Sequence, residues 1–351
     1  MRRIAVITAV VLAVLAGALP ADAQVAEPNI RVTAQRPDSR LKTVTKRVIF
    51  STAQGEPRPD RTVRVRNIGG ATLTVSSMTI TGANLTRFAV EDPDAADGFT
   101  LAPGAFRDVP LSFTPLTDGF GRYAATLETD SNDPGSPTTF TTLKGLHAMG
   151  FEEANEPTLF NVLSTLGFEP HGLPMTNLNP NLTYEDEVNT TYFRPSKAHG
   201  RVAFIPMGRY STIVSGNCCP AGWFERVPTK TKHRLQNWSG GTQVDPGENQ
   251  KLMPVPGTPP SVDPSDTNPN KTVFIPGGDF GLYSGADLSG SAARSMRFFH
   301  ARRADRDNYY EDVWIVVEDQ GTGANGSSTV RNFDHNDFVW LLVNALPSAG
   351  T

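Results

Sequence analysis

The chain has 351 residues, a length typical of about two domains. Hydrophobic residues make up 38% of it, and 31 glycines with 28 prolines favour many turns and short strands. A net charge of −4 without a concentrated basic run disfavours binding to a nucleic-acid backbone, so we expect no nucleic acid among the partners.

Residues 1–23 predict a secretory signal peptide. Arg2 and Arg3 form a charged start, an apolar run extends from Ile4 to Leu19, and the small residues at 21–23 suit cleavage. An uncleaved membrane anchor is the alternative, but the run is short. We expect a secreted, periplasmic or cell-surface protein with no transmembrane segment after cleavage, and cleavage changes the net charge from −4 to −5.

Residues 24–46 are polar and predict a flexible N-terminus. From residue 47 the pattern changes to about seven short runs in which apolar and polar residues alternate, as in "TVRVRN" at 62–67. Turn sequences rich in glycine, asparagine and proline separate these runs. The pattern predicts an antiparallel immunoglobulin-like sandwich over residues 47–148.

Four short motifs in this region carry a family resemblance. They are "NIGGATLTV" at 67–75, "LAPG" at 101–104, "FTP" at 113–115 and "SNDP" at 131–134. Their order resembles the Hydin-type (choice-of-anchor D-like) immunoglobulin-like modules of bacterial secreted proteins. The resemblance implies a spacer or binding scaffold, and no enzyme.

A short amphipathic helix is predicted at the start of the second domain, which we place at residues 149–347. Asn155 suits a helix cap, Pro157 suits the first turn, and Gly167 can end the helix. Its apolar stripe consists of Leu159, Val162, Leu163 and Leu166.

Strand-like segments follow, interrupted by residues 241–271, whose seven prolines predict a long loop without regular structure. The fold class we expect is all-β: an immunoglobulin-like sandwich, then a larger β-sandwich-like domain with one short helix.

The second domain also resembles a known type of module, one that often follows such immunoglobulin-like repeats in exported bacterial proteins. Matching stretches are "NEPTLFNVLSTLGF" at 155–168, "GDFGLYSG" at 278–285 and "FDHNDFVWLLVNALP" at 333–347. Relatives of this kind occur beside sugar-binding modules, so the resemblance implies work on an extracellular glycan or at a surface.

An acidic group near the C-terminus is the candidate metal site. Its members are Glu318, Asp319, Asp334, Asn336 and Asp337. Calcium takes roughly six to eight oxygen ligands, which such side chains supply. The spacing is not that of an EF-hand. The alternatives are a structural Asx turn that leads into the last strand, or a catalytic group.

The run after this group predicts a core strand. Alternation sends Phe338, Trp340 and Leu342 to one face. Val339, Leu341 and Val343 go to the other face. Because both faces are apolar, we expect a central strand that is buried on both sides.

Trp223 and Trp238 are the candidate ligand-binding residues. Their sequence neighbours indicate loops, where an exposed indole could stack on a sugar ring. Packing in the core is the alternative for both. Trp314 and Trp340 lie in apolar runs and are predicted core residues.

The chain has two cysteines, Cys218 and Cys219, and they are adjacent. A long-range disulfide framework is therefore excluded. In an exported protein this pair predicts a vicinal disulfide, within what looks like a turn. A free thiol or an intermolecular bond is the alternative.

No catalytic residue is predicted, because the sequence contains none of the common nucleophile, metalloprotease or phosphate-loop motifs. The leading hypothesis is an exported, non-catalytic binding or adhesion protein that recognises a glycan or a surface protein, with a loop that calcium stabilises. The alternative is a structural component of a cell-surface or appendage assembly. A polysaccharide hydrolase is a remote third possibility.

Overall fold

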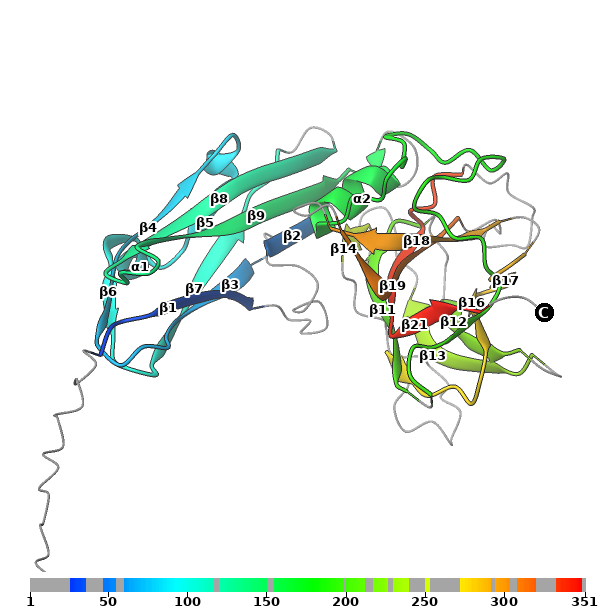
Figure 1. Ribbon diagram of the computed structural model, residues 1–351. Helices are drawn as coiled ribbons and strands as arrows, with labels where there is room; N and C mark the ends of the chain where they lie inside the picture. The colour runs from blue at the N-terminus through cyan, green and yellow to red at the C-terminus, as the bar shows by residue number, and fades with distance from the viewer. Residues whose placement is uncertain are drawn as a thin grey trace, which may run out of the picture.

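The computed structural model describes the chain in thirteen segments. These are residues 26–35, 47–54, 60–116, 120–149, 155–198, 200–211, 217–226, 230–239, 250–252, 272–291, 294–303, 308–319 and 333–348. Two β-rich bodies lie side by side, with helix α2 (Leu159–Leu166) where they meet (Figure 1). The predicted all-β class is confirmed. No helix within these segments is long and apolar enough to cross a membrane.

The first body is a sandwich of two sheets. One sheet has the order β1 (Ile30–Gln35), β3 (Asp60–Asn67), β7 (Phe106–Phe113), β5 (Phe88–Val90). The other has the order β2 (Arg47–Ala53), β9 (Thr138–Ala148), β8 (Gly121–Ser131), β4 (Leu73–Thr81), β6 (Phe99–Leu101). A 3-10 helix, η2 (Leu85–Arg87), and a short helix, α1 (Pro93–Asp97), connect strands. Val63 and Val65 are fully buried between the sheets, as their alternation predicted.

Two expectations for this body were wrong. The N-terminus predicted to be flexible contains β1, which pairs with β3 along six residues. Ile30, Val32 and Ala34 alternate within β1 and contact the core, which explains the pairing. The sandwich is also not purely antiparallel, because β2 pairs with β9 in parallel.

The second body is a larger sandwich. Its outer sheet contains β13 (Lys232–Ser239), β12 (Asn217–Glu225), β16 (Phe280–Ser284), β10 (Phe193–Pro195) and β21 (Ala345–Pro347), with β17 (Asp287–Leu288) beside β16. Its inner sheet contains β14 (Lys251–Leu252), β11 (Val202–Arg209), β20 (Phe338–Val343), β19 (Tyr309–Glu318) and β18 (Met296–Arg302), with β15 (Val273–Phe274) beside β11. Strand β14 corrects the expectation that 241–271 lacks regular structure, although most of that stretch lies outside the described residues.

Strand β20 lies at the centre of the inner sheet, between β11 and β19, as predicted. Phe338, Trp340 and Leu342 belong to the core between the two sheets. Val339 and Leu341 belong to a second core on the opposite face. The inner sheet is therefore buried on both faces.

Helix α2 covers that opposite face. Its cap is Thr158, whose hydroxyl accepts a hydrogen bond from the Asn161 amide at 3.3 Å, and this corrects the expected cap at Asn155. Gly167 ends the helix in the left-handed conformation at φ 102°, as predicted. The four predicted apolar positions of the helix are all buried.

The same helix joins the two bodies. Ile49, Leu146 and Ala148 of the first sandwich belong to one apolar cluster with α2 and the inner sheet. Arg47 of β2 donates from Nη1 to the carbonyls of Ser164 and Thr165, at 3.0 and 3.3 Å, in the last turn of α2. A cation at this end also interacts favourably with the helix dipole.

Changing Leu163 of α2 to alanine should lower the free energy of unfolding by about 2–5 kcal/mol, because the side chain is 1% exposed and its removal leaves a cavity. Urea denaturation of the protein without residues 1–23 measures the loss. Leu85→Ala is the control, since Leu85 is 46% exposed and its change should stay within about 0.5 kcal/mol. Equal losses in the two variants would contradict the packing described.

Two neighbouring carboxylates fasten the segment after α2 to strand β18. Glu187 pairs with Arg297 and, at 2.5 Å, with Arg294. Asp186 pairs with Arg302 at 2.7 Å. Burial raises the pKa of Glu187, but hydrogen bonds from Arg297 and the Tyr184 amide outweigh it and hold the pKa below its usual 4.5.

The Glu187 ion pair should make stability depend on pH. Its contribution is fully present above about pH 4.5 and is lost as the pH falls through the lower folded-state pKa. Glu187→Gln should destabilise the protein by about 3–5 kcal/mol at pH 7, because Arg297 is left buried, and by less in acid. Urea unfolding at neutral and acidic pH tests this, with the exposed Glu185→Gln as control. A penalty that is unchanged by acid would rule out the ion pair as its cause.

Candidate ligand-binding site

A pocket of about 800 Å³ opens at one end of the outer sheet of the second body. Strand β12 supplies Trp223 and Glu225, and Arg226 follows it. The loop before β16 supplies Gly277, Gly278 and Asp279, and Tyr192 precedes β10. Glu225 is the register partner of Phe280, so strand pairing brings the loop before β16 beside the end of β12.

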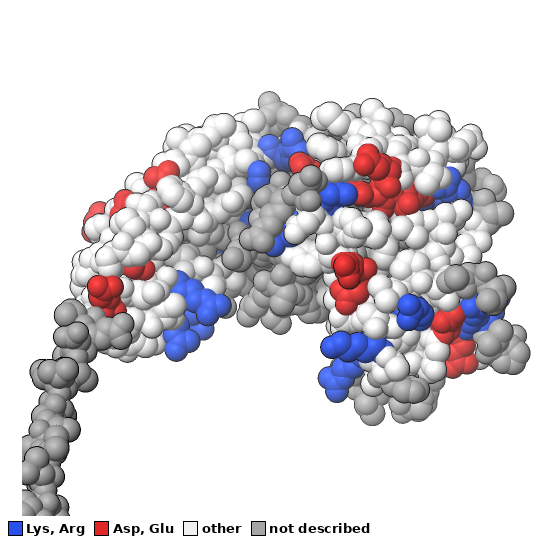
Figure 2. All heavy atoms as spheres, in the orientation of Figure 1, with Lys and Arg blue, Asp and Glu red and all other residues white. Residues whose placement is uncertain are grey.

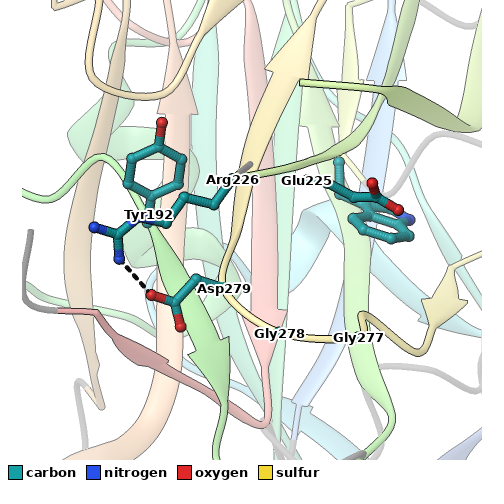
Figure 3. A pocket seen from close by; sticks show the side chains of 7 residues that line it. Tyr192, Glu225, Arg226, Gly277, Gly278 and Asp279 are labelled. Carbon is teal, nitrogen blue, oxygen red and sulfur yellow. Dashed lines mark hydrogen bonds and ion pairs between the residues drawn. The ribbon is translucent and has the colours of Figure 1, made fainter. Parts of the chain in front are cut away.

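An ion pair forms one side of the pocket. Arg226 Nη1 lies 2.6 Å from Asp279 Oδ2, and the guanidinium carbon lies 5.0 Å from the centre of the Tyr192 ring. Ser348 donates a further hydrogen bond to Asp279. Figure 3 shows Tyr192, Arg226 and Asp279 together, with Glu225 on the opposite side of the pocket. Arg226 is therefore held in one orientation at the pocket wall.

The opposite side contains a contact between a carboxylate and an imidazole, together with the indole of Trp223. Glu225 Oε1 lies 3.1 Å from His233 Nε2. The His233 ring stacks on Trp223 at 4.1 Å between centroids, and Phe274 stacks on the same indole at 5.2 Å. Trp223 is 8% exposed, so it offers an edge to the pocket and no open face.

The loop at Gly277 and Gly278 leaves space in the pocket. A Cβ atom added at either glycine would meet no other atom within 4 Å. Neither backbone N–H donates a hydrogen bond within the described part of the chain. The loop therefore carries two backbone donors that are not used within the described residues.

The structure separates the two candidate tryptophans. Both lie in strands, which corrects the expectation of loops. Trp223 lines the pocket, whereas Trp238 is 0% exposed in the core between the sheets and cannot meet a ligand there. Trp314 and Trp340 are core residues, as predicted. Sequence reasoning missed Arg226 and Asp279, which are 53 residues apart and meet only through strand pairing.

Three members of the predicted acidic group come together. Asp319, Asp334 and Asp337 are buried, and one carboxylate oxygen of each lies within 4.8 Å of the others. Glu318 does not join them. It lies directly opposite Phe338, which belongs to the core between the sheets, so the Glu318 side chain projects from the face of the inner sheet that faces this core. Buried carboxylates this close repel one another unless positive charge or a proton compensates.

Asn336 takes a different position. Its Nδ2 donates to the Pro157 carbonyl at 2.6 Å, ahead of α2. Its backbone N–H points to Asp334 Oδ1 at 3.5 Å, a long contact with the pattern of an Asx turn. Phe333 and His335 have positive φ values of 60° and 54°. The turn and the carboxylate group thus share one segment.

Cys218 and Cys219 lie in β12, with Cys218 opposite Trp238 and a register shift before Ala221. The expected turn is therefore a strand with a bulge. The cysteine side chains lie outside the described part of the structure, and the vicinal disulfide stays a prediction.

No protein-family model and no curated protein matches the chain. Among solved structures, it is similar to a protein of unknown function from Porphyromonas gingivalis W83 (16% identity, 34% of this chain and 46% of that one, TM-score 0.25). It is also similar to PapD-like domain 7 of human CEP192 (15% identity, 35% and 87% coverage, TM-score 0.25). A third is the E. coli chaperone DraB (10% identity, 35% and 55% coverage, TM-score 0.23). The chain spans about half the length of the first and third, and likenesses this low do not bear on function.

Calcium at the aspartate group should raise the melting temperature. At a calcium concentration of about a hundred times Kd, binding to the folded state alone predicts a rise of roughly 5 °C relative to the protein in chelator. Asp319→Asn should abolish the difference, whereas Glu311→Gln, an exposed control on β19, should keep it. Identical melting of the unchanged protein with calcium and with chelator would leave the Asx turn as the explanation.

Proposed function

We propose that this chain is an exported, non-catalytic binding protein that takes a neutral saccharide in the pocket of its second domain. The observation that carries the proposal is the pocket itself, with the Arg226–Asp279 ion pair and the Glu225–His233 contact beside a Gly-Gly loop that leaves open space. The predicted signal peptide supports the location, and the resemblance to modules found beside sugar-binding domains agrees with the ligand class.

The balance of charge favours a neutral ligand. The carboxylate of Asp279 faces the guanidinium of Arg226, and Glu225 faces His233. Neither side offers an uncompensated cation, so a strongly anionic ligand gains little here. Carboxylates and guanidinium groups that are fixed by partners form charge-assisted hydrogen bonds to hydroxyl groups, which a sugar supplies in pairs. The indole edge and the Tyr192 ring add apolar contact.

Binding accounts for the pocket better than hydrolysis does. A glycosidase keeps one carboxyl protonated, usually by enclosing it in an apolar setting. Glu225 is 47% exposed at the side chain and Asp279 is 27% exposed, and each faces a basic group. These surroundings suit two hydrogen-bonding carboxylates, and we propose no catalytic role.

A structural component of a surface assembly is the second candidate. Five large apolar side chains among the described residues of the first sandwich are exposed: Ile68 by 51%, Leu85 by 46%, Phe106 by 51%, Leu116 by 45% and Phe140 by 69%. Such side chains would add apolar area to a contact with another protein. Large homo-oligomers in native mass spectrometry would favour this candidate.

A glycan array with the protein lacking residues 1–23 tests the first proposal. At least one neutral saccharide should bind, and Gly278→Leu should remove binding while the protein still folds, because the new side chain enters open space. Arg226→Gln should weaken binding about tenfold or more. Arg201→Gln, an exposed change outside the pocket, is the control. Failure of every neutral saccharide to bind, or full binding by Gly278→Leu, would rule out this function.

A further inference from the structure

The outer face of the sheet β1-β3-β7 carries a row of exposed charge. In this sheet Arg31 lies directly opposite Arg66, and Arg66 lies opposite Phe106. The next row places Arg64 opposite Asp108. Residues directly opposite one another in antiparallel strands project from the same face. Figure 2 shows Lys and Arg side chains gathered over these strands.

One arginine of this face has its partners. Arg64 forms two hydrogen bonds with Asp108, at 2.7 and 2.6 Å. Its guanidinium carbon also lies 3.9 Å from the centre of the Phe106 ring. The Arg64 guanidinium therefore packs against the Phe106 ring, which lies in the first row.

The other two arginines of this face, Arg31 and Arg66, are exposed. Within the described residues neither forms an ion pair or a side-chain hydrogen bond. Like charges directly opposite one another destabilise an antiparallel pair. Packing does not require them, because Ile30 and Val65 supply the core contacts of these strands.

We propose that this face binds an anionic polysaccharide. One sulfate, phosphate or carboxylate group would lie between Arg31 and Arg66, whose planar forks each donate two hydrogen bonds to such an oxyanion. The sugar that carries the group would contact Phe106, which is 51% exposed. The negative charge of the bound group would attract both guanidinium groups and so offset the repulsion between them. This site lies in the first domain and does not depend on the pocket.

The net charge of the chain indicates that a polyanion would bind through this face and not through a general attraction. The net charge is −4, so a general attraction between the protein and a polyanion is not expected. Binding must come from a local arrangement.

The test measures binding of fluorescent dextran sulfate, carboxymethyl dextran and unmodified dextran to the protein lacking residues 1–23. A charged dextran should bind and neutral dextran should not, and the two charged forms identify the preferred group. The double variant Arg31→Gln/Arg66→Gln should bind about tenfold more weakly or worse. The control Arg194→Gln/Arg201→Gln removes the same charge from exposed positions of the second domain and should change binding less than about twofold.

Thermal melting without ligand separates misfolding from lost contacts. The Arg31→Gln/Arg66→Gln variant should melt no lower than the unchanged protein, since it removes a repulsion. Equal loss of binding in the two double variants would reduce the effect to general charge and overturn the proposal. So would equal binding of neutral and charged dextran, or undiminished binding by Arg31→Gln/Arg66→Gln.

Discussion

Burial of the inner sheet on both faces is the constraint on which the rest of this structure depends. Strand β20 is apolar on both faces, so both faces must be covered. The outer sheet covers one face, and the other face needs a second apolar cover. Helix α2 and the first sandwich supply that second cover. Packing of the outer sheet against β20 also sets the positions of β12 and β16, and therefore of the pocket that they line. The start of β20 places Asp337 beside Asp319. Both candidate sites thus follow from one buried sheet.

The two domains are joined by more than a linker. Their apolar side chains form one continuous cluster around α2, and Arg47 and Ser51 of β2 bond across the junction to the end of the helix and to Leu252 of β14. An interface of this kind resembles the interior of a domain more than a transient contact, and relative domain motion is then not the default expectation.

The pattern of apolar residues predicted strands β3 and β20, because in both strands the apolar positions of the pattern are the buried positions. It did not predict β1, because the polar residues around Ile30, Val32 and Ala34 make that segment polar on average. Trp223 and Trp238 were assigned to loops because glycine, proline and cysteine stand beside them, yet pairing with neighbouring strands overrides those local signals. Composition predicted the acidic group, but only the structure shows that Asp319 joins it and, through the register of β19, that Glu318 does not. Arg226 and Asp279 left no sequence signal, since their contact spans two strands.

The proposed surfaces differ in charge, and the difference has a consequence for recognition. The pocket has its cations compensated, whereas the face of β1 and β3 presents two arginines whose charge is not. If both proposals hold, a polysaccharide that contains both neutral and acidic sugars would contact both surfaces at once when its length spans the two domains. Linked binding of this kind multiplies two weak affinities through the effective concentration of the second site. A rigid junction raises that concentration for chains of matching length and lowers it for all others. The apolar cluster around α2 would then select ligands by length, although it touches none of them.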